Sequence, residues 1–74
     1  MKILVQCKGH KSPLSVSAIR DAAGVKLANN PDAMVVVAPN GFTKGSTQFA
    51  LKADIKLVDA SYLNKMVNNQ TDLV

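Results

Sequence analysis

The chain has 74 residues, a single cysteine, a formal net charge of +4, and 47% hydrophobic against 19% charged residues. This balance fits one small globular domain and excludes an intrinsically disordered chain. The lone cysteine excludes a disulfide within the chain, and no apolar run reaches the ~20 residues that a membrane-spanning helix needs. We therefore expect a cytoplasmic protein that does not cross a membrane, with a positive charge compatible with a nucleic-acid partner.

The first predicted element is a strand over residues 2–8. Its segment 3–5 (Ile-Leu-Val) is continuously apolar, which is the pattern of a strand covered on both faces. Cys7 fits the same core as a small apolar residue. Residues 9–13 begin with glycine and end with proline, which predicts a loop.

The next predicted element is a helix over residues 15–29. Ser15 is placed to cap it, because its hydroxyl can accept a hydrogen bond from a free amide of the first turn. An apolar stripe at helical spacing should face the sheet; it comprises Val16, Ile19, Ala23, Leu27 and Ala28. The Asn-Asn-Pro-Asp sequence at 29–32 ends the helix.

The central strand is predicted over residues 33–38 (Ala-Met-Val-Val-Val-Ala), because a β-branched run bounded by turn residues is typical of a buried strand. The Pro-Asn-Gly sequence at 39–41 ends it. A second helix should follow over residues 43–53. Its apolar side comprises Phe49, Ala50 and Ala53.

Residues 55–58 (Ile-Lys-Leu-Val) predict a short third strand, after which Asp59 or Ser61 can cap a last helix. That helix would turn four apolar residues inward: Tyr62, Leu63, Met66 and Val67. Residues 68–74 are mostly polar and are expected to be a frayed tail. Residues 1–67 are therefore predicted to form a single domain.

The predicted order β-α-β-α-β-α places the chain in the α/β class. Strands that alternate with helices pair in parallel through right-handed crossovers, so we expect a small three-stranded parallel sheet flanked by helices. Such a sheet exposes unpaired backbone groups along both edge strands. Because the first strand is long and apolar for an edge, we expect a second copy of the chain to cover it in a homo-oligomer.

Two polar side chains stand together at the end of the first predicted strand. Alternate residues of a strand face the same side, so Gln6 and Lys8 project from one face. Open α/β sheets bind ligands at the carboxyl ends of their strands. Gln6 and Lys8 are therefore the leading candidates for a functional site.

Several segments in order resemble one nuclease family. Residues 5–8 (Val-Gln-Cys-Lys) resemble the Q-x-K form of the PD-(D/E)XK signature of Mrr-type restriction endonucleases. Residues 15–21 are similar to the helix after this triplet, residues 35–43 to an apolar strand with a Gly-Phe-Thr turn, and residues 49–63 to the closing elements. The resemblance covers residues 5–67 and corresponds to the C-terminal part of that domain, a truncated restriction-endonuclease-like core.

This resemblance implies Mg²⁺-dependent cleavage of DNA. Gln6 would offer an amide oxygen to the metal, and Lys8 would be the catalytic cation that orients or activates the attacking water. The family's metal-binding acid precedes the triplet, in a region that this sequence lacks, so we expect a site that is incomplete in one chain. Acids of a second copy are candidates to complete it: Asp32, Asp54, Asp59 and Asp72. The alternative is a non-catalytic oligomeric module that binds DNA or another partner.

Four further basic residues are candidates for binding DNA phosphates: His10, Lys11, Arg20 and Lys44. Ordinary structural roles remain open for each of them. A lone loop histidine is usually solvated, and Arg20 can pair with Asp21. Lys44 follows a strand-to-helix turn in which Phe42 can pack inward and Thr43 can cap the helix.

Overall fold

The structure is a computed structural model that describes residues 1–62. The predicted last helix beyond Tyr62 and the predicted frayed tail at 68–74 lie outside the described residues. Among the described residues, none of the helices has the length and apolar character needed to cross a membrane.

Strands and helices alternate as the sequence predicts. The elements are β1 (Ile3–Cys7), α1 (Val16–Asn29), β2 (Ala33–Val37), α2 (Lys44–Ala53) and β3 (Lys56–Val58). The three strands are parallel in the order β1-β2-β3, with Gln6 beside Val36 and Val36 beside Leu57. The predicted α/β class and three-stranded parallel sheet are confirmed, with element ends that differ from the prediction by one residue.

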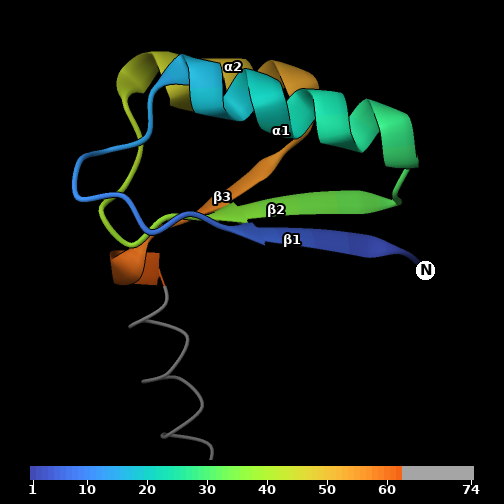
Figure 1. The fold of residues 1–74 in the computed structure, drawn as a ribbon, viewed down its shortest axis with the longest axis horizontal. Helices are drawn as coiled ribbons and strands as arrows, with labels where there is room; N and C mark the ends of the chain where they lie inside the picture. The colour runs from blue at the N-terminus through green and yellow to red at the C-terminus, as the bar shows by residue number, and fades with distance from the viewer. Residues whose placement is uncertain (63–74) are drawn as a thin grey trace, which may run out of the picture.

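Both long helices cover the same face of the sheet (Figure 1). This follows from the strand order, because two successive right-handed crossovers that advance in one direction place both helices on one side. The core lies between the sheet and these helices. Its buried residues are Leu14, Ile19, Ala22, Met34, Val36, Ala38, Ala50 and Ile55.

The other face of the sheet carries apolar side chains that α1 and α2 do not cover. We call it the outer sheet face, and it comprises Ile3, Val5, Cys7, Val35 and Val37. Ile3 and Val5 are 52% and 58% exposed, and Cys7 is also exposed. The expectation that Cys7 lies in the core is therefore wrong within the described residues, and α1 and α2 cover only one face of the first strand. The reason is the alternation along β1, which turns every second side chain away from the helices.

The inner face of α1 differs from the predicted stripe. Ile19 and Ala22 are fully buried, whereas Leu27 is 86% exposed and Ala28 is also exposed. In the last turns of α1, Val25 packs against the core and Lys26 is bonded to α2, whereas Leu27 faces away from both. The prediction for Leu27 and Ala28 is therefore wrong, because the spacing of apolar residues in α1 suits more than one inner face.

The helix caps follow the prediction in α2 but not in α1. Thr43 Oγ1 accepts a hydrogen bond from the Ser46 amide at 3.2 Å, which confirms Thr43 as the cap of α2. Ser15 occupies the cap position of α1 but its side chain accepts no amide hydrogen bond, so that part of the prediction is wrong. Asp59 accepts from the Tyr62 amide at 2.9 Å, as expected for the start of the last helix.

Candidate functional site

The loops after β1 and β2 are bonded to each other at the carboxyl end of the sheet. The Lys8 amide donates to the Val37 carbonyl at 2.8 Å, which extends the β1–β2 pairing into the loops. The side-chain amide of Asn40 donates to the carbonyl of His10. These bonds hold Lys8 and His10, in the loop that follows β1, against β2 and its loop.

A second set of bonds fixes the start of α1. The Leu14 amide donates to the Gly41 carbonyl at 2.9 Å, and the Thr43 amide donates to the Leu14 carbonyl at 3.0 Å. Ser46, which is fully buried, donates its hydroxyl to the same Leu14 carbonyl at 2.7 Å. The loop before α2 and the first turn of α2 therefore fix the position of Leu14. Because α1 begins two residues later, they also fix the start of α1.

A groove of about 320 Å³ lies between the end of β1 and the first turns of α1. We call it the Lys8 groove. Its polar lining consists of Lys8, His10, Ser12, Ser15, Ser17 and Asp21. Two basic side chains, three hydroxyls and one carboxylate therefore meet at the carboxyl end of the sheet, where open α/β sheets bind ligands.

Gln6 and Lys8 project from the face of β1 that carries the helices. Leu4, two residues before Gln6, packs against the core, and alternation places Gln6 and Lys8 on the same side. Both are half-buried. Lys8 lines the groove, whereas Gln6 lies one step deeper along the strand, beside the buried Val36.

The first turn of α1 opens toward this groove with its amides free of a side-chain cap. The Ser15 hydroxyl lies 3.0 Å from the Ser17 hydroxyl, and both residues line the groove. A helix N-terminus carries a partial positive charge and exposed N–H groups, which favour an anion. Together with Lys8 and His10, this end of α1 gives the groove the donors that a phosphate group requires.

The remaining predicted phosphate ligands lie outside the groove. Lys11 is exposed in the loop after β1, and Lys44 is exposed at the first position of α2. Arg20 places its guanidinium 5.9 Å from the centre of the Phe49 ring on α2. Arg20 therefore packs against α2 and does not pair with Asp21, as the sequence had allowed.

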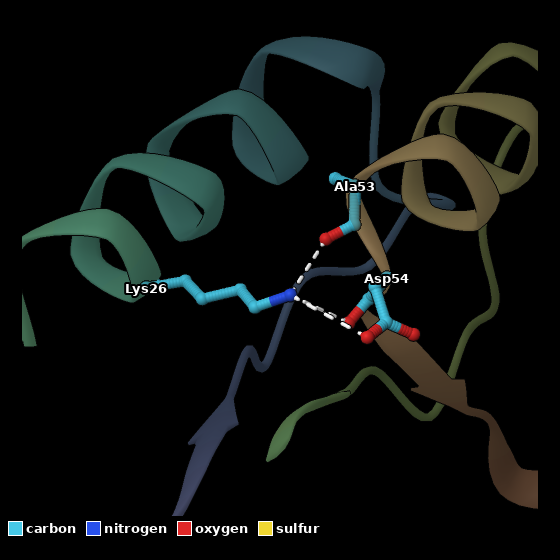
Figure 2. Close-up of polar contacts among 3 residues, drawn as sticks. All are labelled: Lys26, Ala53 and Asp54. Carbon is cyan, nitrogen blue, oxygen red and sulfur yellow. Dashed lines mark hydrogen bonds and ion pairs between the residues drawn. The ribbon is translucent and has the colours of Figure 1, made fainter. Parts of the chain in front are cut away.

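Three of the four acidic residues within 1–62 have partners in their own chain. Asp32 accepts from the Lys2 amide at 2.6 Å, and Asp59 caps the turn at Tyr62. Asp54 lies 3.9 Å from the Lys26 ammonium, which also donates to the carbonyls of Ala53 and Asp54 at the end of α2 (Figure 2). Asp32 and Asp54 stand at the amino end of the sheet, opposite Lys8.

Asp21 is the exception, and the sequence analysis did not select it as a site residue. Within residues 1–62 its carboxylate has no hydrogen bond or ion pair, and it lines the Lys8 groove. The spacing of Ser17 and Asp21, four residues apart on the helix that follows the Gln6-x-Lys8 strand, was the available signal. This spacing points to the groove only when the position of α1 over β1 is known.

Comparison with known proteins bears on the identity of this site. A family model of the Mrr catalytic domain, described as a restriction endonuclease, matches residues 1–67. The chain belongs to the Mrr-type restriction endonuclease family. Neither curated proteins nor solved structures gave a significant match. In this Mrr-type domain, the matched region includes every element described above and the whole Lys8 groove.

The donor set of the Mrr-type domain sets limits on a metal site. Within the described residues, no three His, Cys, Asp or Glu side chains form a cluster able to hold a metal ion by themselves. Mg²⁺ commonly keeps several waters and takes one or two protein carboxylates together with substrate phosphates. The groove offers one exposed carboxylate, that of Asp21, beside the basic side chains of Lys8 and His10, so its lining does not by itself make a Mg²⁺ site.

Proposed function

We propose that this Mrr-type domain binds DNA through its phosphate backbone in the Lys8 groove, and that it cleaves DNA when a carboxylate joins Gln6 and Lys8. The observation that carries the proposal is the meeting of Lys8, His10 and the uncapped start of α1 at one groove. Each of these is a donor that suits a phosphate oxygen.

The chemistry divides among the residues as follows. Lys8 and His10 would bind the phosphate and offset its charge, and Lys8 would also hold the attacking water and stabilise the developing negative charge. Gln6 would offer its side-chain amide oxygen to the metal ion. A bound Mg²⁺ would polarise the phosphate and favour deprotonation of the water. Gln6 alone is a neutral ligand, so cleavage requires an additional carboxylate.

The test uses Lys8→Ala with Lys52→Ala as a matched control, because Lys52 is exposed in the last turn of α2, away from the groove. Binding to a short duplex is measured over a range of salt concentrations. Loss of one phosphate contact should lower the slope of log K against log salt by about 1 in Lys8→Ala only. Plasmid nicking with Mg²⁺ or Mn²⁺ should be lost in the same variant. Equal binding by Lys8→Ala and the native chain would refute the proposed site.

A second candidate function is a non-catalytic oligomeric module, and the outer sheet face favours its oligomeric part. Ile3 and Val5 expose apolar side chains next to the unpaired edge of β1. Exposed edges and contiguous apolar patches commonly mark association surfaces. We propose that two copies of the chain cover this face together, with the Lys8 groove left open on the helix-bearing side.

Val5→Asp tests this association, because it places a carboxylate in the centre of the outer sheet face. Sedimentation at micromolar concentration should give a dimer or larger species for the native chain and a monomer for Val5→Asp. Leu27→Asp is the control, since Leu27 is 86% exposed on α1, on the other side of the sheet. A native chain that sediments as a monomer would contradict the proposal.

A further inference from the structure

The free edge of β1 presents backbone groups that are unpaired within residues 1–62. β1 lies at one side of the sheet and pairs with β2 alone (Figure 1). The Lys8 amide donates to a carbonyl of β2, and the Lys2 carbonyl accepts from an amide of β2. The even-numbered residues of this segment therefore turn their N–H and C=O groups toward β2, and the odd-numbered residues turn theirs toward the open edge. These outward groups belong to Ile3, Val5 and Cys7.

The exposed apolar side chains of the outer sheet face are concentrated along the same edge. Ile3 and Val5 on β1 are 52% and 58% exposed. The face is half-buried on β2 and ends on β3 with the buried Val58. Lys56 of β3 also lies on this face, with its ammonium 5.8 Å from the centre of the Tyr62 ring. A second copy stacked face to face would have to desolvate the Lys56 ammonium, which is costly, whereas a copy placed beside β1 would not.

This edge lacks the features with which edge strands avoid pairing. Charged side chains, prolines and bulges on an edge strand hinder the addition of another strand. Residues 3–7 contain no charged residue and no proline, and β1 keeps one unbroken register with β2 along its whole length. The isoleucine and valine at the edge are β-branched and favour a further strand beside them.

We propose that two copies of the chain join their β1 strands edge to edge, antiparallel, around a two-fold axis at Val5. Such an axis, perpendicular to the sheet, brings the same edge of each copy together and makes the two strands antiparallel. Val5 then lies opposite the partner's Val5, and Ile3 lies opposite the partner's Cys7. Every outward N–H and C=O group of both strands gains a partner in this register. The neighbouring registers place Ile3 or Cys7 opposite a residue outside β1.

This inference rests on the proposed association of two copies and deepens it, because it specifies which residues pair. The result is one continuous sheet in which the β1 side chains of both copies pack across the axis on the outer sheet face. On the helix-bearing face, Lys2 comes opposite the partner's Lys8. The Lys2 ammonium donates to the Asn29 carbonyl at 3.0 Å, so it is already engaged by the end of its own α1.

Cross-linking between single-cysteine chains tests the register. One chain is the native protein, whose single cysteine is Cys7, and the other is Ile3→Cys/Cys7→Ser. In the proposed register the two cysteines of a mixed pair face each other with Cα atoms about 5.5 Å apart, which suits a disulfide. Two like chains hold their cysteines roughly 13 Å apart along the strands, which is too far. The control is Leu27→Cys/Cys7→Ser mixed with the native chain, because Leu27 is 86% exposed on α1.

The mixed chains should give a disulfide-linked heterodimer on mild oxidation with diamide, in many-fold excess over the Leu27 control. Neither chain alone should exceed that control. Both substituted positions on β1 are exposed, so the variants should keep the native circular dichroism spectrum.

Hydrogen exchange followed by nuclear magnetic resonance gives a second readout in chains that keep Cys7. The amides at positions 3, 5 and 7 should exchange slowly in the native chain, because they bond to the partner. They should exchange fast in Val5→Asp, which places two carboxylates opposite each other at the axis. The amides of Leu4 and Gln6 face β2 and should stay protected in both chains.

Sedimentation of the native chain separates the outcomes that overturn the inference. A dimer whose mixed chains cross-link no better than the Leu27 control overturns the edge pairing and leaves the proposed association standing. Equal cross-linking by mixed and like chains shows chance collision and overturns the register. A native chain that sediments as a monomer overturns the proposed association itself, and the inference with it.

Discussion

The two ends of the parallel sheet use their charged side chains in opposite ways. At the amino end, Asp32 accepts from the Lys2 amide, and Lys26 joins α1 to the last residues of α2. The groove there, about 340 Å³, is mostly apolar, and Lys26 is its one charged lining residue. Charges at this end are engaged in holding the fold together.

At the carboxyl end, backbone groups and neutral side chains hold the loops together. The bonds run between Leu14, Gly41 and Thr43, with Ser46 and Asn40 as side-chain donors. The charged side chains of Lys8 and Asp21 have no bond within residues 1–62 and line the groove. The difference shows that a charge left out of the internal bonding network is available to a ligand, while a bonded charge contributes to stability.

Ser46→Ala should have the larger effect on stability. Ser46 is fully buried and its hydroxyl donates to the Leu14 carbonyl at 2.7 Å. Without the Ser46 hydroxyl, the Leu14 carbonyl keeps only the hydrogen bond from the Thr43 amide. The free energy of unfolding, measured by chemical denaturation, should therefore fall by about 1–3 kcal/mol. Thr47→Ala, one residue later on an exposed position, should change it by less than about 0.5 kcal/mol.

The same variant sharpens the comparison between the two ends. Because Ser46 fixes the start of α1, Ser46→Ala should also weaken DNA binding in the Lys8 groove under conditions where the chain remains folded. DNA affinity unchanged by Ser46→Ala would mean that the frame at the carboxyl end does not position the groove.

Lys26→Met should have a smaller effect. The substitution keeps the aliphatic stem and removes the ammonium that donates to the carbonyls of Ala53 and Asp54 at 2.8 and 3.0 Å. Because those carbonyls can be hydrated in the variant, the loss in unfolding free energy should be about 1 kcal/mol. Lys52→Met is the control, with an exposed side chain in the same last turn of α2.

Lys26→Met also tests whether the two ends are functionally distinct. DNA affinity should stay close to that of the native chain, because Lys26 is bonded at the end opposite the groove. A fall as large as that of Lys8→Ala would break the distinction and extend the DNA-binding surface across the whole molecule.

The sequence by itself determined the order of elements and the parallel sheet, and it nominated Gln6 and Lys8 as the leading candidates for the site. The β-branched run at 33–38 and the alternation of strand and helix patterns are local signals, and local signals survive without knowledge of the fold. Alternation along the first strand was enough to place Gln6 and Lys8 on one side. The cap of α2 at Thr43 was equally local.

Only the tertiary structure decided which faces are covered and which charges are free. The positions of Cys7 on the outer sheet face and of Leu27 in solvent depend on both helices packing on one side of the sheet. Asp21 stands out only once α1 is placed over the end of β1, where Asp21 lines the groove. It also stands out because Asp32, Asp54 and Asp59 have partners within the described residues. Burial and pairing are properties of neighbours in space, which a single sequence does not specify.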